Sequence, residues 1–245
     1  MTDSLSTPED RDRTLAPASV RTVIDRGPKG KRAVAFSLDW PGWSRGAKTP
    51  DLALETLESY RPRYAPVAGL AGMSREFEAA GPLQIVEDKV GTGSTDFWAI
   101  SFSPSAAEQD PMGEAELERG LTLLRACWEF FDAVAARVSP QMRKGPRGGG
   151  RDRDRIIGHT IRTESEDFAK RVGLRVPEGG ALTPDGLREY RQAYVAALRA
   201  YNAGQFERRM SSWTLPFLIR HSAFHTLDHA WEMEDRDLST AEVNR

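Results

Sequence analysis

Helical periodicity in the second half of the chain is the feature that most constrains its fold. Residues 114–137 carry large apolar side chains at spacings of three and four, which places them on one face of a long amphipathic helix. This apolar stripe consists of Leu121, Leu124, Trp128, Phe131 and Val134. Further helices are expected at 152–172, 185–202 and 213–235. Four long helices joined by connections of roughly 10 to 15 residues predict a four-helix bundle.

The part of the chain before residue 111 has a different pattern. Apolar runs bounded by glycine and proline turns predict strands at 19–25, 31–38, 83–90 and 97–102. The first two strands are expected to form a hairpin. Helices are expected at 50–60, with Thr49 as the candidate N-cap, and at 66–80. The predicted fold class is therefore an α+β N-terminal module followed by an all-α four-helix bundle.

The predicted organisation has three regions. Residues 1–17 are rich in Asp, Ser, Thr and Pro, which predicts a disordered tail. Residues 18–108 form the small α+β module, and residues 109–245 form the bundle.

Composition excludes several classes of protein. The net charge of −2 argues against a protein that binds polyanions through bulk charge, so nucleic acid is not an expected partner. There is no apolar run near the roughly 18 residues of a membrane span, and the polar, acidic N-terminus does not have the pattern of a signal peptide. We therefore expect a cytoplasmic protein with no membrane partner. The single cysteine, Cys127, lies in an apolar helical stretch and is expected to be a packed core thiol.

All four histidines belong to the helical half of the chain. His221, His225 and His229 are spaced at i, i+4 and i+8, which stacks them on one helix face. His159 lies on the predicted second helix. A single helical histidine is usually a hydrogen-bonded core or surface residue. Three in register favour a metal site, because imidazole is the commonest protein ligand of transition metals.

One ion does not reach all three histidines of the last helix. They span roughly 12 Å at 1.5 Å per residue, whereas two adjacent ones can chelate one ion. Either His221 or His229 is therefore expected to have a supporting or structural role. Glu164 falls inside the apolar arc of the second helix, so its carboxylate must be paired or hydrogen-bonded. It is a candidate to orient a metal-bound imidazole or to accept a proton, and the alternative is a structural salt bridge to an arginine.

The helical half resembles the DinB-like superfamily, which includes mycothiol-dependent maleylpyruvate isomerases and bacillithiol transferases. The resemblance covers about residues 111–237 and depends on a histidine early in the second helix (IIGHTIRTESEDFAKRVG) and an H-x3-H pair near the end (RHSAFHTLDHAWEMEDRD). It implies a divalent transition metal, zinc or nickel, bound by His159, His225 and His229, with Glu164 as the catalytic acid or base. It also implies a low-molecular-weight thiol such as mycothiol. Unlike many members, this chain does not continue its last motif as His-Arg-Gly-Gln.

The N-terminal half resembles another small module, the HicB-like fold. The resemblance depends on the segment AVAFSLDWPGWSRGAKTPDLALETL, in which a strand and a Pro-Gly turn lead into a helix that begins with Thr-Pro. In antitoxins of this type the module neutralises a partner toxin. No helix-turn-helix motif follows here, so the alternatives are a lid, a dimerisation surface or a ligand-sensing sheet.

Two functions follow from these patterns. The first is a metal-dependent thiol S-transferase or isomerase that acts on a small-molecule substrate. The basic segment 143–155 is then either a solvated charged loop or a site for the carboxylates of such a thiol. The second is a non-catalytic stress-response or protein-interaction protein, antitoxin-like, with a structural metal site. A homodimer is a further expectation.

Overall fold

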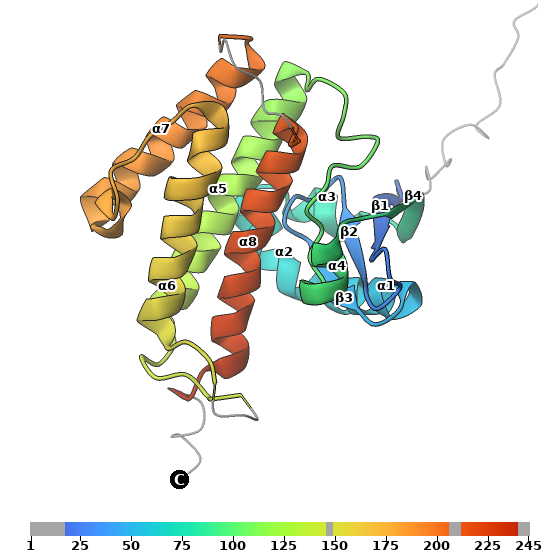
Figure 1. The fold of residues 1–245 in the computed structure, drawn as a ribbon, viewed down its shortest axis with the longest axis horizontal. Coiled ribbons are helices and arrows are strands. Elements are labelled where there is room, and N and C mark those ends of the chain that lie inside the picture. The colour runs from blue at the N-terminus through green and yellow to red at the C-terminus, as the bar shows by residue number, and fades with distance from the viewer. Residues whose placement is uncertain (1–17, 146–148, 206–211, 240–245) are drawn as a thin grey trace, which may run out of the picture.

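The computed structural model describes residues 18–145, 149–205 and 212–239. The predicted tail, 1–17, lies outside the described residues. In Figure 1 a small sheet with short helices lies on one side of four long helices. Residues of the sheet side, among them Phe36, Gly42 and Arg45, contact α8 (Leu215–Arg236), the helix that carries three of the four histidines.

The sheet has four strands in the order β3-β2-β1-β4. β1 (Val20–Arg26) and β2 (Ala33–Ser37) form the predicted antiparallel hairpin, with Ile24 opposite Ala35. β3 (Ser44–Ala47) pairs with β2 and was not among the predicted strands. β4 (Leu83–Val90) pairs with β1 in parallel, so the sheet is mixed.

Four short helices accompany the sheet: α1 (Pro50–Ser59), α2 (Arg61–Leu70), α3 (Ser74–Glu78) and α4 (Gly93–Trp98). Thr49 caps α1 as predicted, because its hydroxyl accepts a hydrogen bond from Leu52 N. The single helix predicted at 66–80 is wrong, since Gly72 has a φ of +72° and separates α2 from α3. The strand predicted at 97–102 is also wrong, because residues 97 and 98 end α4, which Thr92 caps, and residues 99–102 belong to no strand.

The long helices are α5 (Glu114–Arg137), α6 (Arg153–Arg162), α7 (Pro184–Asn202) and α8 (Leu215–Arg236). Their positions agree with the predicted segments. The second segment changes character, however: α6 is followed by a π-helical turn at Thr163–Phe168 and a 3₁₀ turn at Ala169–Val172. None of the helices in the described ranges is both long and apolar enough to cross a membrane.

The predicted fold class is wrong. Over its described residues the chain has eight α-helices and a single four-stranded mixed sheet, with 56% of residues helical and 11% in strands. This is not cleanly an α+β module followed by an all-α bundle. Most of the buried apolar side chains, from β1 through to α8, belong to one hydrophobic cluster, and a second small cluster consists of Val23, Val34 and Phe36. The predicted limits of the regions 18–108 and 109–245 stay predictions.

Close packing of the sheet side against α8 explains why the two parts share a core. Gly42, in the turn between β2 and β3, has a φ of +93°, and a Cβ atom there would lie 2.8 Å from Leu227 and 3.2 Å from the Cβ of Ala223. Only glycine fits this conformation and this approach without strain. Arg45 of β3 lies between two rings, 4.1 Å from that of Tyr60 and 4.4 Å from that of Trp231.

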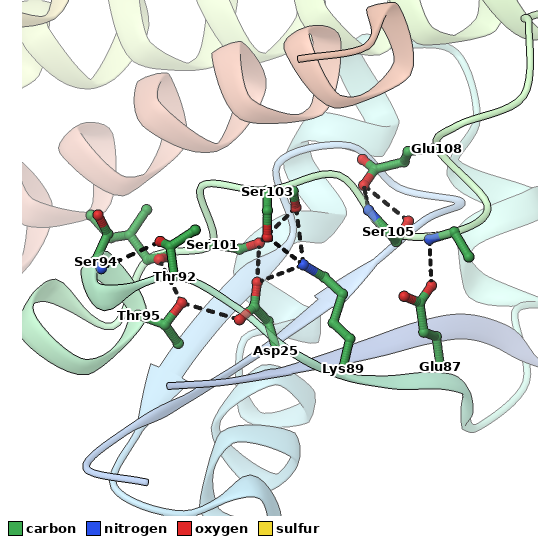
Figure 2. A network of polar contacts seen from close by, with 12 residues as sticks. Asp25, Glu87, Lys89, Thr92, Ser94, Thr95, Ser101, Ser103, Ser105 and Glu108 are labelled. Atoms are coloured by element: carbon green, nitrogen blue, oxygen red, sulfur yellow. Dashed lines mark hydrogen bonds and ion pairs between the residues drawn. The ribbon is translucent and has the colours of Figure 1, made fainter. Parts of the chain in front are cut away.

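A buried polar network fastens the segment after β4 to the sheet (Figure 2). Its centre is Asp25 of β1, which is fully buried. The Asp25 carboxylate accepts hydrogen bonds from Thr95 Oγ1 at 3.1 Å and Ser101 Oγ at 2.7 Å, and Lys89 Nζ lies 3.0 Å away. Lys89 also donates to Ser103 Oγ at 2.6 Å. These contacts hold the connection between β4 and α5 in place.

The same connection reaches α8 through a buried ion pair. Arg220 Nη2 donates to Glu108 Oε2 at 3.1 Å, and both side chains are at most 5% exposed. The Arg220 guanidinium also lies 3.7 Å from the centre of the Phe36 ring of β2. Because Arg220 directly precedes His221, this pair positions the histidine-bearing helix against the sheet.

Candidate metal centre

Three histidines from two helices converge on one point. His159 comes from α6, and His225 and His229 come from successive turns of α8. One nitrogen of each ring lies within 4.8 Å of a nitrogen of the other two. The ring centroids are 5.4 Å (His159 to His225), 5.0 Å (His159 to His229) and 4.7 Å (His225 to His229) apart.

This arrangement fits a transition-metal ion. Zinc–nitrogen bonds of about 2.0–2.1 Å at tetrahedral angles place two ligand nitrogens about 3.3 Å apart. Side-chain rotations that move each ring nitrogen by about 1 Å would therefore bring all three within bonding distance of one ion. His225 Nδ1 is buried and has no hydrogen-bond partner. An unsatisfied buried nitrogen beside two other imidazoles is what a bound cation would satisfy. The donor set of three imidazoles suits zinc, nickel, copper or iron rather than calcium or magnesium.

Burial keeps two of these rings in the form that binds metals. Desolvation lowers the pKa of His159 to about 4, helped by the positive charge of Arg151. Desolvation also lowers the pKa of His225 well below its usual value, and the neighbouring His229 adds to the effect. Both imidazoles are therefore neutral at pH 7. A neutral imidazole has the free lone pair that a metal ligand needs.

A carboxylate orients the third ring. His229 Nδ1 lies 2.8 Å from Glu232 Oε2, and Arg236 Nη1 lies 2.6 Å from the other oxygen of Glu232. A carboxylate only accepts, so Nδ1 carries the hydrogen and Nε2 is left with the lone pair. The hydrogen bond from His229 lowers the pKa of Glu232. This role of Glu232 was not predicted, although its spacing of three residues from His229 and four from Arg236 in the sequence indicates that the three side chains share a helix face.

His221 is not part of the three-histidine group. Its ring is 2% exposed and lies parallel to that of Phe217 at 5.2 Å, with Phe102 at 4.8 Å and Trp213 at 5.2 Å. Burial lowers the pKa of His221 to about 3. Of the two alternatives left open by the helical spacing, the structure assigns the packing role to His221 and places His229 at the centre.

Glu164 lies elsewhere than expected. Its side chain is 2% exposed, and it accepts hydrogen bonds from Trp128 Nε1 at 3.1 and 3.2 Å and from Thr226 Oγ1. Burial raises the pKa of its carboxyl. These contacts tie the π-helical turn to α5 and α8. Glu164 reaches α8 beside His225 but is not a member of the histidine group, and its predicted catalytic role stays a prediction.

Positive charge borders the histidines. Arg151 lowers the pKa of both His159 and His225. A Cβ atom on Gly150, which has a φ of +125°, would lie 2.1 Å from Arg236 Nη2, so the basic segment lies directly on this arginine. Arg236 Nη2 is itself buried without a hydrogen-bond partner. The segment around Arg151 therefore adds positive charge beside the three histidines.

Comparison of this chain with protein-family models, with curated proteins and with solved structures finds no match. The two family resemblances noted from the sequence therefore stay proposals.

Proposed function

We propose that this protein is a metal-dependent enzyme whose centre is formed by His159, His225 and His229. The single observation that carries the proposal is the approach of three imidazole nitrogens to within 4.8 Å of one another. The hydrogen bond from His229 to Glu232 supports it, because histidine ligands usually donate their second nitrogen to a carboxylate or carbonyl.

The proposed reaction is the transfer or isomerisation of a small molecule with the help of a low-molecular-weight thiol such as mycothiol. When bound, a divalent ion with three protein ligands supplies an open position at which the pKa of a thiol or water is lowered. The protein's own groups have separate tasks. Glu232 holds the tautomer of His229, and Arg151 and Arg236 attract an anionic substrate or the carboxylate of the thiol. Zinc or nickel is the proposed metal, and the cytoplasm is the proposed location.

Elemental analysis of the purified protein tests the centre. We expect about one equivalent of a divalent transition metal in the wild type and its loss in His225→Ala. The matched control is His221→Gln, which changes a histidine of the same helix outside the group and is expected to keep the metal. Retention of stoichiometric metal by His225→Ala would show that these three histidines are not the ligands.

One observation favours a second function, in which the metal is structural. The group joins α6 to α8, so an ion there would cross-link two helices of the bundle. The two functions differ in their response to substrates. Stabilisation by metal together with turnover or heat release on addition of thiols supports the enzyme. A large effect of chelator on the melting temperature, without any response to a panel of thiols and electrophiles, supports the non-catalytic protein.

A further inference from the structure

Two neighbouring aromatic side chains of α4 are exposed to solvent. Phe97 is 72% and Trp98 is 59% exposed, whereas every other Phe, Tyr and Trp in the described ranges is buried or half-buried. The two rings touch edge to face, with centroids 4.9 Å apart. Single exposed apolar residues are common on protein surfaces and need no explanation, but adjacent exposed aromatic rings indicate a surface that contacts something other than water.

The helix that carries this aromatic pair is held firmly to the sheet. Thr95 donates to the carboxylate of the buried Asp25 at 3.1 Å (Figure 2). The next residue, Asp96, accepts hydrogen bonds from the backbone N–H of Lys29 at 2.7 Å and of Lys31 at 2.8 Å, so α4 is also fastened to the turn between β1 and β2. The exposure of the two rings is therefore a fixed feature of the fold.

The turn between β1 and β2, next to the aromatic pair, is basic. Lys29, Lys31 and Arg32 are exposed, and none of them forms an ion pair with any residue in the described ranges. Lys48 is also exposed and unpaired among these residues. It directly follows β3, whose last residue pairs with the first residue of β2, so it lies at the same end of the sheet. Four cations that no carboxylate holds thus lie at this end.

The carboxylates at this end do not cancel its positive charge. Asp88 is paired with Arg26, and the charge of Asp51 also acts on Arg26. Asp96 is occupied by backbone N–H groups of the turn. With Arg26 included, five cations lie among three carboxylates, so this end of the sheet is positive in a chain whose net charge is −2.

An exposed aromatic pair beside unpaired cations complements the surface of an anionic bilayer. Tryptophan and other amphipathic rings are favoured at the headgroup level of a membrane, and Lys and Arg are attracted to anionic lipids. Nucleic acid fits this surface less well, because rings that meet edge to face do not offer the row of ring faces on which successive bases stack.

We propose that the end of the sheet formed by α4 and the β1–β2 turn binds the surface of an anionic membrane, with Phe97 and Trp98 at headgroup level and Lys29, Lys31 and Arg32 beside the lipid phosphates. The expectation of no membrane partner came from the lack of a spanning segment, and a peripheral contact needs none. The inference does not depend on the metal centre, because none of these residues belongs to the histidine group.

Co-sedimentation of the full chain with phosphatidylglycerol vesicles tests the proposal. We expect binding at low ionic strength, weaker binding at high salt and none to phosphatidylcholine vesicles. The double variant Lys29→Glu/Lys31→Glu is expected to lower the partition coefficient at least about twentyfold, because each cation near an anionic surface contributes about fivefold. The matched control is Lys170→Glu/Arg175→Glu, which makes the same change of charge at two exposed, unpaired residues elsewhere in the described chain and should bind nearly like the wild type.

Vesicles with brominated acyl chains test whether the aromatic pair enters the bilayer. Trp98 is the only exposed tryptophan among the described residues, so its fluorescence should be quenched on binding. Trp98→Phe keeps an aromatic ring and is expected to bind while losing most of the quenching. Phe97→Ser/Trp98→Ser is expected to lower the partition coefficient at least about tenfold, since two rings no longer leave water. Circular dichroism and the melting temperature report whether each variant folds.

Four results would overturn the proposal. They are the absence of binding to phosphatidylglycerol vesicles, equal binding to phosphatidylcholine vesicles, an equal loss of binding in the two double charge variants, and equal quenching of the wild type and Trp98→Phe. Binding of a single-stranded oligodeoxythymidine without binding of vesicles would also overturn it, in favour of nucleic acid.

Discussion

His229 donates its Nδ1 hydrogen to Glu232 at 2.8 Å, and both residues lie on the same face of α8. Arg236, four residues further along this helix, holds the other oxygen of Glu232 at 2.6 Å. The orientation of His229 is therefore determined within a single helix. His159 and His225, in contrast, meet only because α6 packs beside α8.

Replacing Glu232 with Gln is expected to weaken metal binding without removing it. The amide keeps the shape of the side chain but loses the charge that strengthens the hydrogen bond from His229, which typically costs about tenfold or more in metal affinity. Competition with a chromophoric chelator measures the effect. Glu234→Gln is the matched control, since Glu234 lies on the same helix and pairs with Arg63 and Arg137 instead. Equal affinities in the two variants would contradict the role of Glu232.

The stability of the metal-free protein is expected to fall as the pH is lowered from 7 to 5. The pKa of His159 is about 4 and that of His221 about 3 in the folded state, whereas a histidine of the unfolded chain takes up a proton near pH 6.5. The unfolded state therefore binds more protons in this range, so the free energy of unfolding rises with pH. Each histidine contributes a slope of at most about 1.4 kcal/mol per pH unit.

Urea unfolding at pH 7, 6 and 5 measures this slope. The window lies above the range in which ordinary carboxylates take up protons. Glu164, whose pKa burial raises, contributes in the opposite direction, and the three buried histidines are expected to outweigh this one carboxyl. His221→Gln removes one of the three histidines whose pKa is lowered in the folded state, which are His159, His221 and His225, and is expected to reduce the slope. A free energy of unfolding that does not change with pH would contradict the burial of neutral imidazoles.

Glu164→Gln and Glu164→Leu are expected to differ in stability. The amide of Gln can accept the hydrogen bond from Trp128 and donate to Thr226, so this variant should unfold within about 1 kcal/mol of the wild type. Leu leaves the buried indole N–H of Trp128 without a partner, which costs about 1 to 3 kcal/mol. Because burial raises the pKa of Glu164, the wild type loses stability relative to Glu164→Gln as the pH rises above about 4.5. Urea unfolding of the wild type and the two variants at pH 5 and 8 tests the cost of the Leu substitution and the pH dependence. A Glu164→Leu variant as stable as Glu164→Gln would refute the first of these expectations.

Gly42→Ala is expected to destabilise the protein more than Gly30→Ala. Both glycines have a positive φ, so both substitutions carry a backbone strain of about 1 to 2 kcal/mol. Only at Gly42 would the new Cβ also collide with α8, at 2.8 Å from Leu227, whereas nothing lies within 4 Å of a Cβ at Gly30. Thermal or urea unfolding compares the two. Equal losses would mean that the contact between the β2–β3 turn and α8 does not contribute to stability.

Local sequence pattern determined most of the helices. The limits of α5 and the start of α1 at its Thr49 cap depend on side chains within one or two turns, so periodicity and capping residues were sufficient. The same applies to the histidines of α8, whose common face follows from a spacing of four residues. The sequence by itself therefore indicated a helical protein with a histidine-rich face.

Tertiary structure decided the rest. The parallel pairing of β1 with β4, the strand β3 and the shared core depend on contacts between residues far apart in the chain, which periodicity does not encode. Likewise, His221 and His229 are equivalent in spacing around His225, and only the packing of α6 places His159 beside His229 while aromatic side chains enclose His221. Glu164 shows the same limit: its position in an apolar arc predicted a paired carboxyl, but its partners Trp128 and Thr226 come from two other helices. The physical reason is that local geometry depends on neighbours three or four residues away, whereas burial depends on which surfaces meet when the whole chain folds.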